Sequence, residues 1–150
     1  MIHTEICRQT ISIDKSIAFV THRSCGALCT FIGTVRDNND GKKVTALEYE
    51  CYLPMAENVL NAIAQDAERQ FDIENIFIVH RYGHLAVSDI SVLICVSSAH
   101  RNDSFEACRF IIETIKKDVP LWKKEYYEDS PAQWVTCRHD LKKEQCLHIH

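Results

Sequence analysis

One segment, Ile90–Ser98, constrains the fold of this chain more than any other. Its sequence, ISVLICVSS, is nearly continuous in apolar residues, which is typical of a strand inside a sheet. The run is interrupted by serines and is far too short to cross a bilayer as a helix. We therefore expect this segment to be a central strand of a globular domain, and we expect no membrane partner.

A long helix is predicted after this strand. Asp103 and Glu106 form a D-x-x-E pattern that is typical of a helix start. Pro120 ends the helix near Val119, because a proline disfavours helical geometry in the residue before it. The spacing of the apolar residues predicts one buried face, made of Phe105, Cys108, Ile112, Ile115 and Val119.

The remaining pattern mixes strands with shorter helical segments. Turn residues at Asp37–Lys43 predict a hairpin between the strands on either side of them. Asp14 is predicted to cap a short helix that runs through Arg23, and Pro54 to open a longer helix. Further strands are predicted at Thr4–Ile13, Gly26–Arg36, Val44–Tyr52, Asn75–Tyr82 and Leu121–Tyr127. The mixture predicts an α+β fold with a largely antiparallel sheet.

Length and composition fit one domain, residues 1–150. The chain is 46% hydrophobic and 25% charged, and 150 residues are enough for a real core. Its start, MIHTEICRQTISI, lacks the charged and then apolar segments of a secretory signal, so we expect a cytoplasmic protein with reduced cysteines. The tail after about residue 136 carries cysteines and histidines. We expect it to be a frayed end rather than a metal site.

Positive charge gathers around a bend in a chain whose net charge is −4. Residues 116–124 hold four lysines and one aspartate, which favours an anionic ligand, but the cluster is too short to predict nucleic-acid binding. Lys116 precedes the bend and Lys123 follows it, so their amines could converge. Neighbouring ammonium groups lower each other's pKa, which would suit an acid, a base or a nucleophile. The alternative is two solvated lysines. We place Trp122 in the core.

Two further segments could bind anions. Ser97–Arg101 joins the central strand to the long helix, where free backbone N–H groups, His100 and Arg101 could hold a phosphate. An ordinary polar loop explains that segment equally well. Arg36, at a strand end, is a weaker candidate. His80 and His84 are four residues apart but fall in a strand and a turn, so we expect no metal site there.

These segments together resemble the large, catalytic subunit of molybdopterin synthase. The resemblance covers about residues 25 to 135. Its blocks are FIGTVRDNNDGKKVTALEYECYLPMA, IVHRYGHL, SSAHRNDSFEACRFIIETIKKDVPLWKKE and QWV. The resemblance implies an α/β hammerhead-like fold with an additional antiparallel sheet. It also implies a homodimer of large subunits, which forms a heterotetramer with two small ubiquitin-like subunits.

The resemblance further implies a reaction. The Gly-Gly thiocarboxylate of the small subunit would donate sulfur to cyclic pyranopterin monophosphate and form the dithiolene of molybdopterin, without a metal or another cofactor. By position, Lys116 and Lys123 would be catalytic. Arg36, His100 and Arg101 would bind the substrate, with a contribution from the neighbouring protomer. The alternative is a non-catalytic anion-binding or docking module that uses the same residues.

Overall fold

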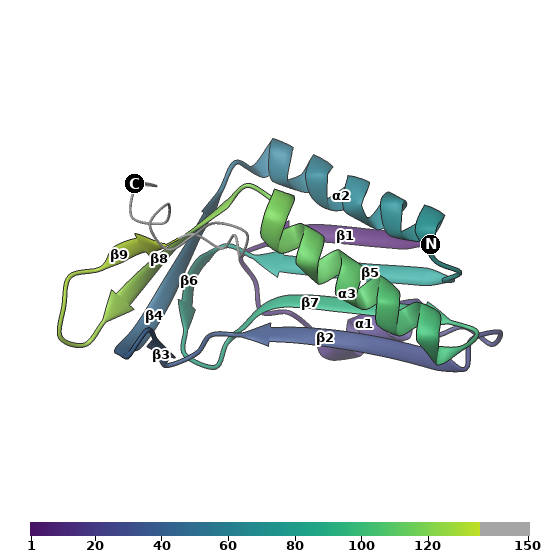
Figure 1. Ribbon diagram of the computed structural model, residues 1–150, viewed down its shortest axis with the longest axis horizontal. Helices are drawn as coiled ribbons and strands as arrows, with labels where there is room; N and C mark the ends of the chain where they lie inside the picture. Colours follow the sequence, from purple (N-terminus) through teal and green to yellow (C-terminus); the bar gives the residue numbers. More distant parts are fainter. Residues whose placement is uncertain (136–150) are drawn as a thin grey trace.

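The computed structural model describes residues 1–135, which form three helices and two sheets (Figure 1). The first sheet has the strand order β1-β5-β7-β2, and the second has the order β3-β4-β8-β9, with β6 also paired to β4. In chain order the elements are β1 (Ile2–Cys7), α1 (Ile13–Val20), β2 (Ala27–Thr34), β3 (Asn38–Asn39), β4 (Lys42–Cys51), α2 (Leu53–Gln70), β5 (Asn75–Arg81), β6 (Gly83–Ala86), β7 (Ile90–Ser98), α3 (Arg101–Asp118), β8 (Leu121–Tyr127) and β9 (Gln133–Val135).

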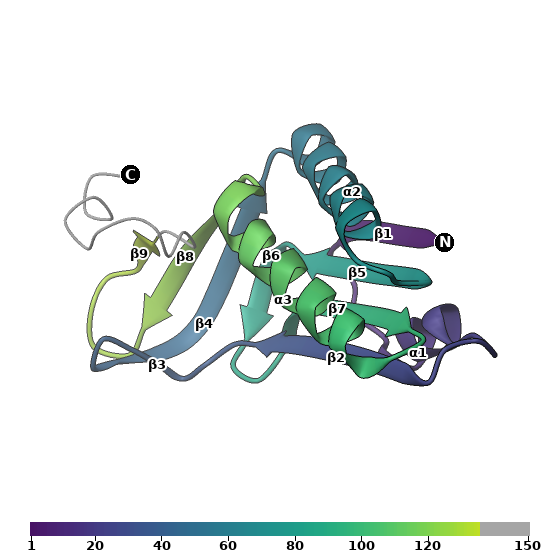
Figure 2. The ribbon, with the colours of Figure 1, turned by 45° about the vertical axis from the view of Figure 1, so that its right-hand side comes forward.

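The expected α+β class is confirmed, with the second sheet as the additional antiparallel one. Only β1 and β5 pair in parallel. Helices α2 and α3 cover one face of the first sheet and α1 covers the other (Figure 2). The tail after residue 135 lies outside the described residues. Among residues 1–135, no helix is long and apolar enough to cross a membrane.

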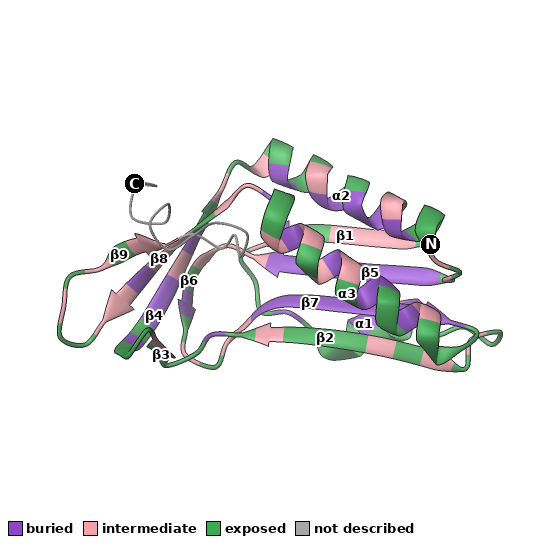
Figure 3. Cartoon of the chain, viewed as in Figure 1, coloured by how far each residue is buried: buried purple, intermediate pink, exposed green. Residues whose placement is uncertain are grey.

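The prediction of a central strand at Ile90–Ser98 is confirmed. β7 lies between β5 and β2, and every residue from Ser91 to Ser98 is buried (Figure 3). Alternate side chains pack on opposite faces: Ile94 joins the core beneath α2 and α3, and Leu93 joins the smaller core beneath α1. Burial on both faces explains why this strand has no polar alternation.

The predicted hairpin is wrong. Strand β2 pairs antiparallel with β7 over most of its length, whereas β4 crosses into the second sheet and pairs with β8 and β6. The turn residues close a shorter hairpin between β3 and β4. There Asp40 and Gly41 have positive φ angles of 49° and 79°, which favour residues of their type.

Helix boundaries also differ from the predictions. Ser12, not Asp14, caps α1, and its Oγ accepts a hydrogen bond from the backbone N–H of Lys15 at 3.2 Å. The first strand ends at Cys7 instead of Ile13. Helix α3 starts at Arg101 with His100 as its N-cap residue, which places Asp103 in the first turn instead of at the cap.

Two aromatic residues predicted to be buried are exposed. Phe105 is 57% exposed and Trp122 is 46% exposed. Phe105 lies off the buried face of α3, which consists of Ser104, Ala107, Cys108, Ile111 and Ile115. Trp122 faces the outer side of the second sheet, because Lys123 beside it takes the inner side. Both exposed rings are therefore available for contacts outside this chain.

Candidate active site

A pocket of about 390 Å³ lies where the two sheets meet the C-terminal end of α3. Strand β2 and the segment after it form one wall, β4 and β8 form the opposite wall, and the start of β7 contributes between them. Its lining residues are Phe31, Ile32, Gly33, Thr34, Arg36, Asn38, Val44, Leu47, Tyr49, Ser91, Val92, Lys116, Lys123 and Glu125. The pocket therefore draws on segments that are far apart in the sequence.

The bend at Pro120 brings the two candidate lysines to this one pocket. Lys116 lies in the last turn of α3, which ends at Asp118, and β8 begins three residues later. Alternation along β8 turns Lys123 inward and Lys124 outward, where the Lys124 ammonium lies over the rings of Tyr126 and Trp134. The sequence left open whether the two amines converge, and in the structure both lysines line this one pocket.

Arg36 lines the same pocket, from the segment just after β2. Its guanidinium is a fixed cation, because arginine stays protonated in proteins. Three cationic side chains thus share the pocket with one carboxylate, that of Glu125. Their surplus of positive charge suits a ligand with more than one negative charge.

His100 and Arg101 do not reach this pocket. They are exposed at the start of α3, and Lys116 lies in its last turn. At 1.5 Å per residue, the 15 residues from Arg101 to Lys116 span about 22 Å. Within one chain, the predicted phosphate residues and the lysine pair are therefore at opposite ends of the helix.

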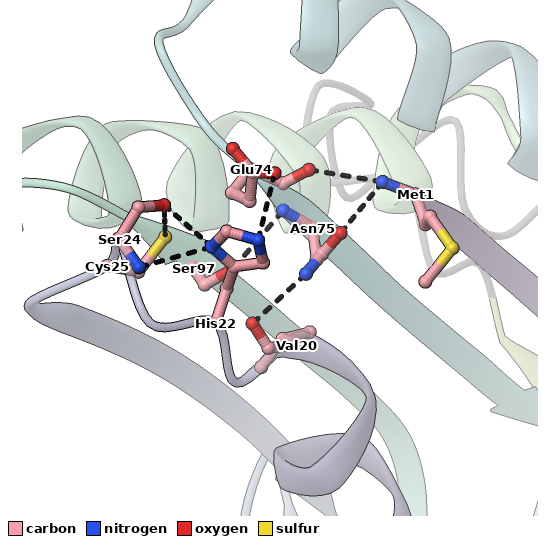
Figure 4. A network of polar contacts seen from close by, with 8 residues as sticks. All are labelled: Met1, Val20, His22, Ser24, Cys25, Glu74, Asn75 and Ser97. Carbon is pink, nitrogen blue, oxygen red and sulfur yellow. Dashed lines mark hydrogen bonds and ion pairs between the residues drawn. The ribbon is translucent and has the colours of Figure 1, made fainter.

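A polar network lies at the end of the first sheet where β5 begins and β7 ends (Figure 4). The side chain of Asn75 accepts from the amino group of Met1 at 2.8 Å and donates to the carbonyl of Val20 at 3.3 Å. Its backbone N–H donates to Ser97 Oγ at 3.2 Å. Since Ser97 is close to the end of β7, the network helps to hold the loop from which His100 projects.

Sequence reasoning missed Glu125, a pocket residue that is only 2% exposed. Its carboxylate accepts hydrogen bonds from Asn39 Nδ2 at 2.9 and 3.1 Å and from the Tyr127 hydroxyl at 2.8 Å. It also pairs with Lys123 Nζ at 3.4 Å. Burial and the hydrogen bond to Glu125 raise the pKa of Tyr127. The sequence did offer one signal for Glu125. It is two residues from Lys123, and residues two apart in a strand share a face.

Replacing Glu125 by alanine is expected to lower the free energy of unfolding by about 3–5 kcal/mol, because it leaves a partly buried ammonium and two polar partners without their acceptor. Chemical denaturation of both proteins measures the difference. The matched control is Glu128→Ala, which removes an exposed carboxylate 3.6 Å from Lys43 and should change the free energy by about 0.5 kcal/mol or less. Equal effects of the two substitutions on the free energy of unfolding would contradict the role of Glu125 as a buried acceptor for its neighbours.

His80 and Tyr49 lie beneath the pocket. Tyr49 lines it, and its ring meets that of His80 edge to face, with centroids 5.2 Å apart. Burial, with a contribution from the charge of Lys116, lowers the pKa of His80 to about 4. The imidazole is therefore neutral at pH 7.

This low pKa predicts a loss of stability in acid. The folded chain resists protonation of His80, whereas the unfolded chain takes up the proton near pH 6.5. The contribution of neutral His80 to the free energy of unfolding is complete above about pH 6.5. It is lost as the pH falls from there through 4, by up to about 3 kcal/mol. Urea unfolding at pH 7 and pH 4 tests it. His80→Gln should flatten this part of the pH dependence, whereas His84→Gln, at an exposed position, should keep it.

Among residues 1–135, no three histidine, cysteine, aspartate or glutamate side chains are grouped so that they could hold a metal ion. The His80 ring is buried and its Nδ1 contacts the carbonyl of Arg81, whereas His84 is exposed. The histidines and cysteines of the tail lie outside the described residues. The pocket itself offers cations, a carboxylate and hydrogen-bond donors.

Comparison with known proteins agrees with this architecture. The MoaE protein family matches residues 6–118. The bovine protein named molybdopterin synthase catalytic subunit is 45% identical over 126 residues, which are 84% of this chain and 67% of that protein. The chain thus spans about two thirds of the length of this relative.

Solved structures show the same fold. The crystal structure of molybdopterin synthase from Staphylococcus aureus matches with a TM-score of 0.80 and 43% identity, over 87% of this chain and 94% of that one. A complex of subunits 1 and 2 of molybdopterin-converting factor from Helicobacter pylori matches with a TM-score of 0.67 over 91% of both chains; at 17% identity it shows the fold alone. The resemblance found in the sequence is confirmed. The chain belongs to the MoaE family, the family of molybdopterin synthase catalytic subunits.

Proposed function

We propose that this chain is the catalytic subunit of a molybdopterin synthase. In two successive transfers, each from the C-terminal thiocarboxylate of a small ubiquitin-like subunit, it moves two sulfur atoms to cyclic pyranopterin monophosphate and forms the dithiolene of molybdopterin; each transfer leaves the small subunit with a C-terminal carboxylate. The observation that carries the proposal is the pocket in which Lys116, Lys123 and Arg36 come together, in a chain that is acidic overall. Family membership directs the choice of reaction.

The pocket's charge fits the two reactants. A thiocarboxylate and a phosphate are both negative, so they repel each other as they approach. Three cations against the single carboxylate of Glu125 offset that repulsion. A pocket of about 390 Å³ also has the size expected for a small phosphorylated heterocycle together with the end of a peptide tail.

The two lysines take different roles. Lys116 is the acid–base group nearest the inserted tail, and it moves the protons required by attack on the pterin side chain and by the opening of the cyclic phosphate. Lys123 orients the thiocarboxylate and stabilises developing negative charge. Glu125, 3.4 Å from its Nζ, holds the Lys123 ammonium in place. Arg36 contacts the phosphate through its planar fork.

His100 and Arg101 act on the pocket of a neighbouring protomer. Strand β2 is an edge of the first sheet, and a groove of about 530 Å³ runs between it and α3. Exposed apolar side chains flank the groove, and Phe31 lines both the groove and the lysine pocket. A two-fold axis across this groove would lay two α3 helices antiparallel, so that the His100 end of one meets the Lys116 end of the other. We propose this face for the homodimer.

The small subunit is the second partner, and the assembly is a heterotetramer in the cytoplasm. Family membership supports this partner. The Gly-Gly tail would enter the pocket from the side where Lys116 and Lys123 converge.

Product formation tests the proposal directly. The purified chain is mixed with a thiocarboxylated small subunit and cyclic pyranopterin monophosphate, and molybdopterin is measured in a single turnover. We expect product that depends on the thiocarboxylate, and none with the small subunit in its carboxylate form. Absence of product although the small subunit binds would instead favour a docking module.

A further inference from the structure

Strand β5 carries a buried histidine where its neighbours on the same face are isoleucines. Ile76 and Ile78 pack into the core beneath α2 and α3, and His80 follows on that face with 3% exposure. Burial of a polar ring costs free energy unless its nitrogens are satisfied, and an aliphatic residue would avoid that cost. The position of the ring therefore requires a reason other than packing.

Three residues that line the pocket are neighbours of His80, one each from β7, β4 and α3. On β7, its register partner is Val92, which lines the pocket. On β4, the ring of Tyr49 lies between it and the pocket space, at a centroid distance of 5.2 Å and an interplanar angle of 79°. From α3, Lys116 lines the same pocket, and its charge contributes to the lowered pKa of His80.

The hydrogen bond of His80 defines which nitrogen carries the proton. Nδ1 lies 2.8 Å from the backbone carbonyl of Arg81, and a carbonyl only accepts, so Nδ1 bears the hydrogen. Since the ring is neutral, Nε2 keeps a lone pair. A neutral ring with a lone pair can lie beside an ammonium, whereas an imidazolium would repel it.

We propose that His80 is a positioning residue of the lysine pocket: its neutral ring supports Tyr49 and gives Lys116 an uncharged neighbour that bears a lone pair. Its effect on turnover rests on the function proposed above. The electrostatic contact between His80 and Lys116 does not, because it is a property of the folded chain. The two parts are therefore tested separately.

The contact is tested by nuclear magnetic resonance titration of the histidine rings in the full chain. In the native protein, the His80 signal should remain that of a neutral ring down to about pH 5. Lys116→Gln removes the nearby charge and should raise the pKa of His80. Lys117→Gln, a matched change at the exposed neighbour on α3, should leave it unchanged. A His80 pKa that is the same in all three proteins overturns the proposal, whatever reaction the protein performs.

The effect on turnover is tested with two substitutions at position 80. His80→Phe keeps a ring against Tyr49 but removes both nitrogens, and should lower kcat about tenfold with KM within about twofold of native. His80→Gln restores a donor and an acceptor and should recover kcat to within about threefold. The control is His84→Gln, at an exposed position on β6, with native kcat.

Several results would overturn the positioning role. One is a folded His80→Phe protein with native kcat. Another is an equal loss of kcat in both variants, in proportion to the fall in their melting temperatures. Such a result would indicate that His80 has a purely structural role. If His80→Phe does not fold, the turnover of His80→Gln and the titration decide whether His80 has a positioning role. If the native protein forms no product, the proposed function fails, and the titration alone decides whether His80 and Lys116 interact.

Discussion

Replacement of Lys116 by alanine is expected to slow single-turnover formation of molybdopterin about 100-fold or more, which corresponds to about 3 kcal/mol of transition-state stabilisation. The side chain lies in the last turn of α3 and lines the pocket with Lys123. Its ammonium would donate a proton as the cyclic phosphate opens, and its amine would accept one during attack on the pterin side chain. Alanine can do neither, and the acid–base part of catalysis is lost.

The matched control is Lys117→Ala. Lys117 is the next residue on α3, carries the same charge and is exposed outside the pocket, so a substitution there should leave turnover within about twofold of native. Binding of the small subunit by each variant is measured in parallel, which separates loss of chemistry from loss of the partner. Product formation at the native rate by Lys116→Ala would keep the family assignment and move the proton transfers to another group.

The sequence predicted the features whose causes are local. β7 was identifiable because burial on both faces leaves a continuous apolar run. The end of α3 was identifiable because Pro120 acts on the residue next to it. The bend at Pro120 also indicated that Lys116 and Lys123 could converge, and both line the same pocket.

The errors concern pairings between distant segments. Turn residues at 37–43 predicted a hairpin between the two long strands, but β2 pairs with β7, some 60 residues further along the chain, and the turn joins only the two-residue strand β3 to β4. Glu125 was missed for a similar reason. Its burial depends on Asn39 and Tyr127, which reach it only once β3 and β8 are in place.

His100 and Arg101 show the limit of a single chain. Their position at the end of a strand and the start of a helix predicted a phosphate site, and in the folded chain both residues are exposed about 22 Å along α3 from Lys116. Within residues 1–135, the cationic pocket lies at the other end of that helix. A two-fold arrangement across the β2–α3 groove would bring a partner's pocket to them, and it makes a quantitative prediction about mixed dimers.

Arg101→Ala is expected to lower turnover by about 10- to 100-fold, since a charged hydrogen bond to phosphate contributes about 1.5–3 kcal/mol. If Arg101 serves the partner's pocket, this loss can be complemented. Dimers that combine one Arg101→Ala protomer with one Lys116→Ala protomer are purified with two different tags. In such a dimer, one pocket has an intact Lys116 and faces an intact Arg101 of the partner, whereas the other pocket lacks both. We expect about half of native turnover per dimer from two nearly inactive parents.

A dimer of Lys116→Ala with Lys123→Ala is the control that makes this result decisive. Both lysines line the pocket of the same protomer, so each pocket of that mixed dimer lacks one of them and no activity should return. Recovery in the first dimer and not in the second would place Arg101 in the neighbour's site. If both mixed dimers stay as inactive as their parents, Arg101 does not serve the neighbour's pocket, and phosphate binding reduces to Arg36 and the lysines of one chain. If both recover equally, Lys116 and Lys123 act in pockets of different protomers, and recovery in the first dimer no longer identifies Arg101 as the residue that crosses the interface.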